Sequence, residues 1–409
     1  MEQFALSSPW AIRHSSRMSN SAASRLVLGS FSEASVTAAA REALSEVGGR
    51  ASCALVFVSA DYRAHLPDFL ELIQVHGHAP VVVGCSGSGL IGTNTEAERA
   101  SGFSLLLLNL PETTLTPFTF AEGQVEESSG PGFWLMETGV GAEEVDAWIV
   151  LGDPMRLDVS RWLNEWNLAY PGVPTLGGLA SGGARGDDTF VMCNREVLAG
   201  GGVALGLRGG VRLHPLVSQG CTPIGEPHPV TGAQGNVITT LGQRPAYEVL
   251  QETFAALPDA VKGRAQGNLF AGLATSEYID EFKRGDFLVR NLLGADPNSG
   301  AVAIGATPRV GQTLQFQLRD REAAGEDLHE LTGAAHAAGI RPFATLLFSC
   351  NGRGRGLFGV ESHDARMLGK TFGPLPGAGF FCNGEIGPVG TTNFIHGYTA
   401  SAALLCDVE

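Results

Sequence analysis

The strongest constraint on the fold is a block of sequence that occurs more than once. Its first copy begins with helix-forming residues at 36–47 that end at two glycines, followed by a buried-strand pattern, "ALVFVS" (54–59). A helical pattern follows at 65–76, and Pro80 then opens a second strand, "VVVG", that leads into a glycine-rich loop. The unit is therefore helix, strand, helix, strand and glycine loop.

A second copy of this unit lies about one hundred residues further along the chain. "DAWIVLGDP" (146–154) has the pattern of a buried strand, 158–170 that of a helix, and Pro174 opens "TLGGLASGG". The two buried strands are displaced by 93 residues and the two prolines by 94. Because the strand and the proline are displaced by nearly the same number of residues, the sequence indicates internal duplication.

A third copy lies near the C-terminus. A helical pattern at 326–339 precedes the strand "FATLLFSC" (343–350), and "FCNGEIGPVG" matches the earlier "GCSGSGLIG" with Cys382 over Cys85. Strands that alternate with helices predict an α/β protein. We expect repeated helix-strand-helix-strand units that form mixed sheets covered by helices.

The length of 409 residues predicts two domains. The sequence changes character near 215–240, so we expect a first domain at 35–225 and a second at 240–409, with a disordered tail at 1–34. Within the second domain, residues 286–320 alternate strand-like runs with turn residues, which predicts an antiparallel stretch.

Composition excludes several classes of partner. The net charge is −15, so a basic surface for nucleic acid is not expected. The longest apolar run, "FSLLLLNL", is far shorter than the roughly 20 residues that span a bilayer, so no membrane segment is expected. Seven scattered cysteines without a C-x-x-C pair favour a reducing, cytoplasmic location. The Ser- and Arg-containing N-terminus faintly resembles an organelle transit segment, but we favour an untethered tail.

Several motifs resemble the FIST family, in which a FIST N-terminal domain precedes a FIST C-terminal domain. In the first half they are "VVVGCSGSGLIG" and "TLGGLASGG". In the second half they are "LGQRPAYEVL", "FLVRNLLGADP", "FSCNGRG", "HDA" and "GFFCNGEIGP...NFIHGYTASAALL". The similarity runs from about residue 35 to the end, and "F-x-C-x-G-R-G" followed by "N-G-E-I-G-P" is its most specific part.

The resemblance implies a small-ligand sensory domain in signal transduction, with an amino acid or a similar zwitterionic metabolite as the ligand class. Some relatives carry an F-box and recruit substrates for ubiquitin ligases. No F-box-like helical region precedes residue 35, so that role is not expected here. The signal is expected to leave through a partner protein.

Arg353 and Glu385 lie in two glycine-rich loops that follow equivalent strands. If these loops meet at one sheet edge, the guanidinium could bind an α-carboxylate and Glu385 an α-ammonium group. The alternative is that the two side chains bond each other and brace the loops, because buried charges usually have partners. Both interpretations remain open at this point.

The predicted ligand-binding residues all lie at strand ends or in the loops that follow them. Such strand ends commonly form the ligand cleft of α/β sheets. The predicted set is Cys350, Asn351, Gly352, Arg353, Gly354, Asn383, Gly384, Glu385, His396, Cys85, Ser86 and Gly87.

Two other functions remain as alternatives. Cys350 or Cys382 could be the nucleophile of a cysteine-dependent enzyme, with His363 or His396 as the base, although free cysteines are most often buried hydrophobes. The glycine loops could instead hold a protein segment in an F-box-independent adaptor. No catalytic residue, cofactor or metal site is predicted, because the phosphate-binding and zinc spacings are absent.

Overall fold

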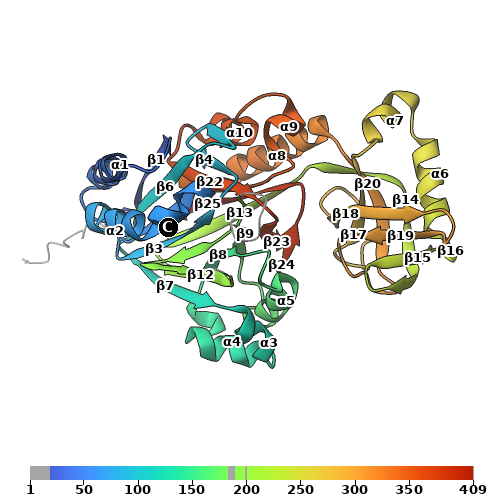
Figure 1. Ribbon diagram of the computed structural model, residues 1–409, viewed down its shortest axis with the longest axis horizontal. Helices are drawn as coiled ribbons and strands as arrows, with labels where there is room; N and C mark the ends of the chain where they lie inside the picture. The colour runs from blue at the N-terminus through green and yellow to red at the C-terminus, as the bar shows by residue number, and fades with distance from the viewer. Residues whose placement is uncertain (1–18, 183–188, 199, 409) are drawn as a thin grey trace, which may run out of the picture.

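The computed structural model describes residues 19–182, 189–198 and 200–408. The described residues form two lobes, which lie side by side in Figure 1. The larger lobe, called here the body, contains the described residues of 19–219 and 320–408. The smaller lobe, called here the barrel, contains residues 221–319.

The body contains three sheets, each of six strands within the described residues. The first has the order β1 (Ser21–Leu28), β6 (Gly102–Asn109), β2 (Cys53–Val58), β3 (Val81–Ser86), β10 (Val191–Cys193), β11 (Glu196–Leu198). The second has the order β7 (Thr113–Phe120), β12 (Gly202–Gly209), β8 (Ala147–Gly152), β9 (Thr175–Leu179), β23 (Glu385–Val389), β24 (Thr392–His396). The third has the order β13 (Val211–Gln219), β25 (Thr399–Asp407), β21 (Pro342–Cys350), β22 (Gly377–Cys382), β4 (Gly89–Gly92), β5 (Thr95–Glu98).

The three sheets share one plan. In each, a central parallel pair (β2 and β3, β8 and β9, β21 and β22) is flanked by an antiparallel strand. The hairpin that completes each sheet comes from another unit: β4–β5 joins β22, β10–β11 joins β3, and β23–β24 joins β9. The mixed α/β fold built from repeated units is therefore confirmed, and the exchanged hairpins link the three units in a closed ring.

Helices cover the outer faces of the sheets. The first sheet carries α1 (Glu33–Glu46) and α2 (Leu66–Gly77), with η1 (Ala60–His65) before α2. Near the second lie α3 (Glu122–Glu127), α4 (Pro131–Thr138), η2 (Ala142–Glu144) and α5 (Val159–Ala169). On the third lie α8 (Arg321–Ala337) and α10 (His363–Phe372), with α9 (Gly354–Phe358) nearby.

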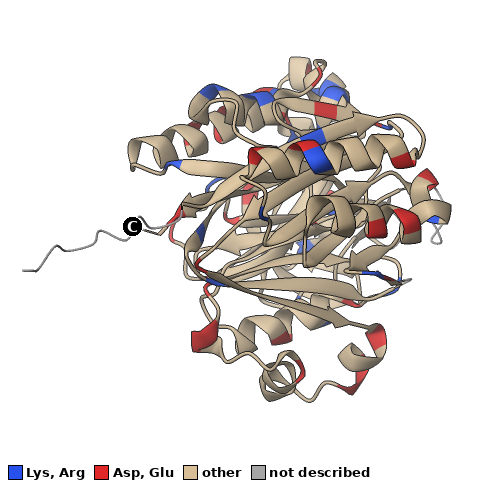
Figure 2. Cartoon of the chain, turned by 90° about the vertical axis from the view of Figure 1, so that its left-hand side faces the viewer, with Lys and Arg blue, Asp and Glu red and all other residues tan. Residues whose placement is uncertain are grey.

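The inner faces of the three sheets share one hydrophobic core. Phe57 of the first sheet stacks on Phe380 of the third, with ring centroids 5.0 Å apart. Phe348 meets both rings edge-on, and Leu176 of the second sheet joins the same cluster. Figure 2 shows most Lys, Arg, Asp and Glu residues on the helices and edges, while the strands are largely free of charge.

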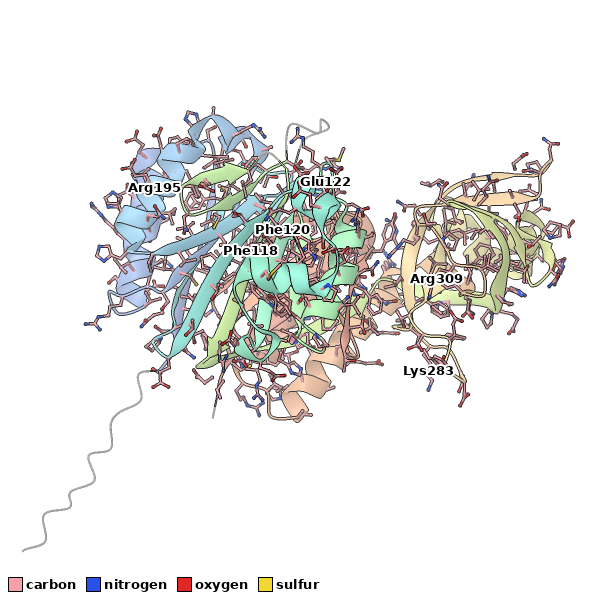
Figure 3. The ribbon with its side chains drawn as sticks, turned by 90° about the horizontal axis from the view of Figure 1, so that it is seen from below. Phe118, Phe120, Glu122, Arg195, Lys283 and Arg309 are labelled. Carbon is pink, nitrogen blue, oxygen red and sulfur yellow. The ribbon has the colours of Figure 1, made fainter. Side chains whose placement is uncertain are left out.

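The barrel is antiparallel throughout. Its strands follow one another as β14 (Cys221–Gln234), β20 (Thr313–Arg319), β17 (Leu269–Ala274), β18 (Phe287–Asp296), β19 (Ala301–Ile304) and β15 (Val237–Leu241). Pairing of β14 with β15 closes the ring, and the short strand β16 (Arg244–Pro245) pairs antiparallel with the end of β15. Helices α6 (Ala246–Ala256) and α7 (Asp259–Ala265) belong to this lobe, which Figure 3 shows from below beside the body. The predicted antiparallel stretch at 286–320 is confirmed.

Two expectations about chain organisation need correction. The tail predicted for 1–34 is wrong for residues 21–34, because β1 pairs with β6 over its whole length and α1 begins at Glu33. Residues 1–18 lie outside the described residues. The division at 225–240 also does not match the lobes, because the barrel is inserted between the second and third units and residues 320–408 return to the body.

Among the described helices, none combines the length and apolar character needed to cross a bilayer.

Candidate ligand cavity

A cavity of about 610 Å³ lies where the strand ends of the body face the barrel. We call it the interlobe cavity. The body contributes the ends of β21 and β22, the end of β24 and the start of α5, and the barrel contributes β18 and β20. Six of the predicted residues line it: Cys350, Asn351, Gly352, Asn383, Gly384 and His396.

Two glycines in the loops that line the cavity lie too close to neighbouring side chains to be replaced by a larger residue. Gly384 has φ +133°, and a Cβ there would lie 3.0 Å from the Leu179 side chain. A Cβ on Gly352 would lie 2.7 Å from the Tyr398 ring. The Asn351 and Asn383 side chains beside these glycines are exposed. The loops therefore bring polar amides to the cavity wall while their backbone stays close-packed.

Cys85, Ser86 and Gly87 are not brought to this cavity. Cys85 is fully buried in the shared core, and Ser86 Oγ accepts a hydrogen bond from the Phe190 N–H at 3.2 Å. The Gly87 N–H donates to Val58 O at 2.8 Å. These contacts fix the end of β3 to its neighbours, so the structure gives the three residues packing and backbone roles.

The strand ends of the three units hold one another. The Ser181 N–H donates to Ser86 O at 3.0 Å, and the Ser88 N–H donates to Ser181 Oγ at 2.8 Å. The Ser181 hydroxyl in turn donates to Phe381 O. These hydrogen bonds tie the strand ends of the three units together beside the cavity.

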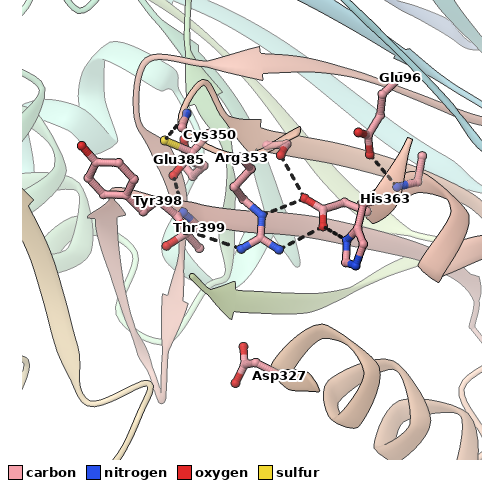
Figure 4. Close-up of polar contacts among 12 residues, drawn as sticks. Glu96, Asp327, Cys350, Arg353, His363, Glu385, Tyr398 and Thr399 are labelled. Atoms are coloured by element: carbon pink, nitrogen blue, oxygen red, sulfur yellow. Dashed lines mark hydrogen bonds and ion pairs between the residues drawn. The ribbon is translucent and has the colours of Figure 1, made fainter. Parts of the chain in front are cut away.

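Arg353 forms a buried ion pair with Asp364 at the first turn of α10. Its Nε lies 2.7 Å from Asp364 Oδ2 and its Nη2 2.9 Å from Oδ1, and its side chain is 0% exposed (Figure 4). Ser349 Oγ and His363 Nδ1 also contact this carboxylate, at 3.1 and 2.9 Å. Burial opposes ionisation, but the Arg353 charge outweighs it and holds the pKa of Asp364 well below its usual range.

The Arg353–Asp364 pair bears on the two roles predicted for Arg353, which are binding a ligand carboxylate and bracing the loops through Glu385. The described Arg353 and Glu385 side chains form no ion pair within 4 Å, and Arg353 braces α10 through Asp364 instead. Arg353 also lines, with Asn351, a separate cavity of about 250 Å³. A ligand contact by Arg353 stays a prediction. Gly354, with φ +61°, packs against the Glu98 carboxylate, where a Cβ would lie 2.6 Å from Oε1.

Glu385 is a buried acid that forms no ion pair within 4 Å among the described residues. Its Oε2 accepts from the Thr399 N–H at 3.2 Å, whereas Oε1 has no hydrogen-bond partner among the described residues (Figure 4). Burial raises the pKa of Glu385 well above its usual range. This direction favours the neutral form of the carboxyl, and a contact of Glu385 with an α-ammonium group stays a prediction.

Cys350 shares this environment. Its thiol lies beside Glu385, and burial, together with that carboxyl, raises the pKa of Cys350 far above the usual thiol range. Burial lowers the pKa of His396 to about 4, and its Nε2 contacts Gly387 O at 3.0 Å. His363 stacks on Phe358 and contacts Asp364. A thiol whose pKa is raised by burial lacks the lowered pKa that a cysteine nucleophile needs.

Two arginines of the cavity wall, Arg290 and Arg319, are not among the residues predicted from the sequence. Arg290 of β18 donates from Nη1 to Val289 O at 2.9 Å and from Nη2 to Ile395 O at 3.0 Å. Arg319 of β20 lies over the Tyr398 ring, with Cζ 5.7 Å from its centroid, and its Nη1 is 3.4 Å from Gly352 O. Arg290 belongs to the motif "FLVRNLLGADP", which was a usable signal.

Comparisons with known proteins agree with the resemblance. The FIST N domain matches residues 52–244 and the FIST C domain residues 246–388. The uncharacterized protein Rv0628c of Mycobacterium tuberculosis is 38% identical over 377 residues, covering 91% of this chain and 96% of its own. The uncharacterized protein Mb0898c of Mycobacterium bovis is 37% identical over 374 residues, covering 90% and 94%.

Among solved structures, cyanuric acid hydrolase from A. caulinodans covers 96% of this chain and 100% of its own, with a TM-score of 0.33 and 9% identity. That likeness is too distant to support any inference about function. The two domain matches and the mycobacterial relatives together show that this chain belongs to the FIST family.

Proposed function

We propose that this protein is a cytoplasmic sensory protein that binds a small polar metabolite in the interlobe cavity and passes the signal to a partner protein. FIST domains are associated with sensory and signal-transduction roles. The observation that carries the proposal is the cavity itself, in which strand ends of the body meet the barrel. Its volume of about 610 Å³ lies within the roughly 300–1,000 Å³ typical of small-molecule sites.

The chemistry of the wall supports a polar ligand. Exposed amides of Asn351 and Asn383 stand beside closely packed glycines. The Tyr398 hydroxyl of the body donates to Asn291 Oδ1 of the barrel at 2.7 Å. An amino acid or similar zwitterion is the ligand class we propose. Binding between the lobes would change how they are held together, and a partner could recognise that change.

Thermal unfolding against a panel of metabolites tests the proposal. The panel contains amino acids, carboxylates, and neutral sugars, amides and nucleosides. A ligand at about 100 times its Kd stabilises the native state by roughly 2.7 kcal/mol, which raises Tm. We expect a selective shift that Asn383→Trp abolishes by filling the cavity. Asn164→Trp, on the exposed side of α5 and outside the cavity, is the matched control.

Two outcomes of the unfolding experiment would contradict the proposal. A shift that survives in Asn383→Trp would place the ligand elsewhere. Absence of any shift across the panel would count against a small-molecule sensor and favour an adaptor that binds a protein segment, which should capture its partner without any metabolite.

A further inference from the structure

The interlobe cavity has a cationic wall. Arg290 and Arg319 both come from barrel strands, and both reach across to carbonyl oxygens of the body, Ile395 O and Gly352 O. Both line the cavity. The barrel therefore presents two guanidinium groups to the space that it shares with the body.

Neither guanidinium has an acidic partner within the described residues. No Asp or Glu oxygen there lies within 4 Å of either side chain, whereas Arg353 and Arg244 both have carboxylate partners. Arg290 is half-buried, and this burial lowers its pKa to about 10, so its charge has lost part of its hydration. A half-buried cation that donates only to neutral carbonyls is incompletely compensated, and an anion from outside the chain would complete the compensation.

The opposite side of the cavity limits what that anion can be. Asp158 also lines the cavity, and its Oδ1 accepts from the Arg161 N–H at 3.0 Å as the N-cap of α5. The side chains of Asn351 and Asn383 lie on the same body side. A ligand that is anionic at every end would be repelled by Asp158, whereas a carboxylate on a ligand with a neutral or cationic remainder is compatible with both walls.

We propose that Arg290 and Arg319 form the subsite for a carboxylate group of the ligand. This inference rests on the proposed function and specifies its ligand class. A planar guanidinium binds a carboxylate through two parallel hydrogen bonds, and Arg290 retains N–H groups beyond the two that it donates to carbonyls. The ligand would then be held by the barrel at its carboxylate and by the body at its other end.

The test pairs each carboxylate of the panel with its carboxamide. We expect a carboxylate that raises Tm, while its carboxamide at the same concentration does not. Titration by calorimetry should show at least a tenfold higher Kd in Arg290→Gln and in Arg319→Gln. Arg309→Gln, an exposed barrel arginine outside the cavity and labelled in Figure 3, should bind as the wild type does.

Arg290→Gln removes contacts between the lobes, so Arg290→Lys serves as a second variant. It keeps the positive charge but loses the two parallel N–H donors of the guanidinium. Its far-UV circular dichroism spectrum should match that of the wild type. Equal binding of carboxylate and carboxamide, or unchanged Kd in both Gln variants, would overturn the subsite. A shift by inorganic phosphate alone that is lost in the Gln variants would assign the wall to phosphate instead.

Failure of this inference is distinguishable from failure of the proposed function. If neutral compounds raise Tm and carboxylates do not, the sensor stands and the carboxylate subsite falls. If no compound raises Tm, both fall.

Discussion

The body and the cavity wall hold their arginines in two different ways. In the body, Arg353 is neutralised inside the chain by Asp364, and both side chains are sealed from solvent. In the cavity wall, Arg290 donates only to backbone carbonyls, and no described carboxylate lies within ion-pair distance. The first arrangement is complete as it stands, whereas the second leaves one charge without a counterion.

This difference separates structural from functional charge within one fold. An internally paired arginine contributes to stability through its partner, and removing either member leaves a buried charge uncompensated. An arginine without an internal partner orphans no acid when it is removed. Stability measurements and binding measurements should therefore respond to different arginines.

The largest effect is expected from Arg353→Met. The substitution leaves the Asp364 carboxylate buried without its cation, which typically costs about 3–5 kcal/mol. Urea unfolding followed by fluorescence measures the loss, with separate transitions fitted if the lobes unfold in separate steps. Arg244→Met, which breaks the exposed pair with Glu252, is the control and should cost less than about 1 kcal/mol.

The double variant Arg353→Met/Asp364→Leu sharpens this result. Replacing both charges by apolar groups removes the uncompensated carboxylate, so the double variant should be more stable than Arg353→Met alone. If the double variant is as unstable as the single one, the loss comes from packing and not from the unpaired charge.

Glu385 should give an intermediate effect that depends on pH. Its pKa is raised in the folded state, so the folded protein keeps a proton that the unfolded chain loses above a pKa of about 4.3. Stability from this group is complete below that pH and is lost as pH rises toward the folded pKa, by up to about 1.4 kcal/mol per pH unit. Glu385→Gln cannot ionise and escapes this loss.

Unfolding free energies of the wild type and Glu385→Gln at pH 5, 6, 7 and 8 check this prediction. The variant should gain stability relative to the wild type at each step. Glu96, whose pKa burial raises to about 8, is present in both proteins, so its contribution cancels in the difference. Parallel pH curves would mean that Glu385 is ionised in the folded state and would weaken the contrast with Asp364.

The repeated units could be predicted from the sequence because their signals are local. Apolar runs such as 343–350 and the prolines at the starts of strands mark the elements directly. The exchange of hairpins could not be predicted, since β4–β5 pairs with β22 almost 300 residues away and nothing local specifies that partner. β1 was missed because its serine-rich start resembles an untethered terminus.

The candidate site could be predicted only where glycine-rich loops mark it. Asn351, Gly352, Asn383 and Gly384 follow from the strand ends. Asp364 was missed as the partner of Arg353 because folding brings it there on α10.

Arg290 and Arg319 were missed because a charged residue in an antiparallel strand has the pattern of an ordinary solvent-facing position. Only the packing of the body against the barrel gives them their role in the cavity wall.

The smallest effect on stability is expected from Arg319→Gln, and it tests the comparison most directly. The substitution loses one long contact to Gly352 O, at 3.4 Å, and a cation–π contact with Tyr398 of about 0.5–1 kcal/mol. It leaves no described acid unpaired, so the free energy of unfolding should fall by no more than about 1 kcal/mol, well below the loss in Arg353→Met. Urea unfolding of both variants under the same conditions measures the difference. A loss of stability in Arg319→Gln equal to that in Arg353→Met would show that the cavity arginine is structural. The absence of an internal counterion would then not distinguish a ligand-binding arginine from a structural one in this fold.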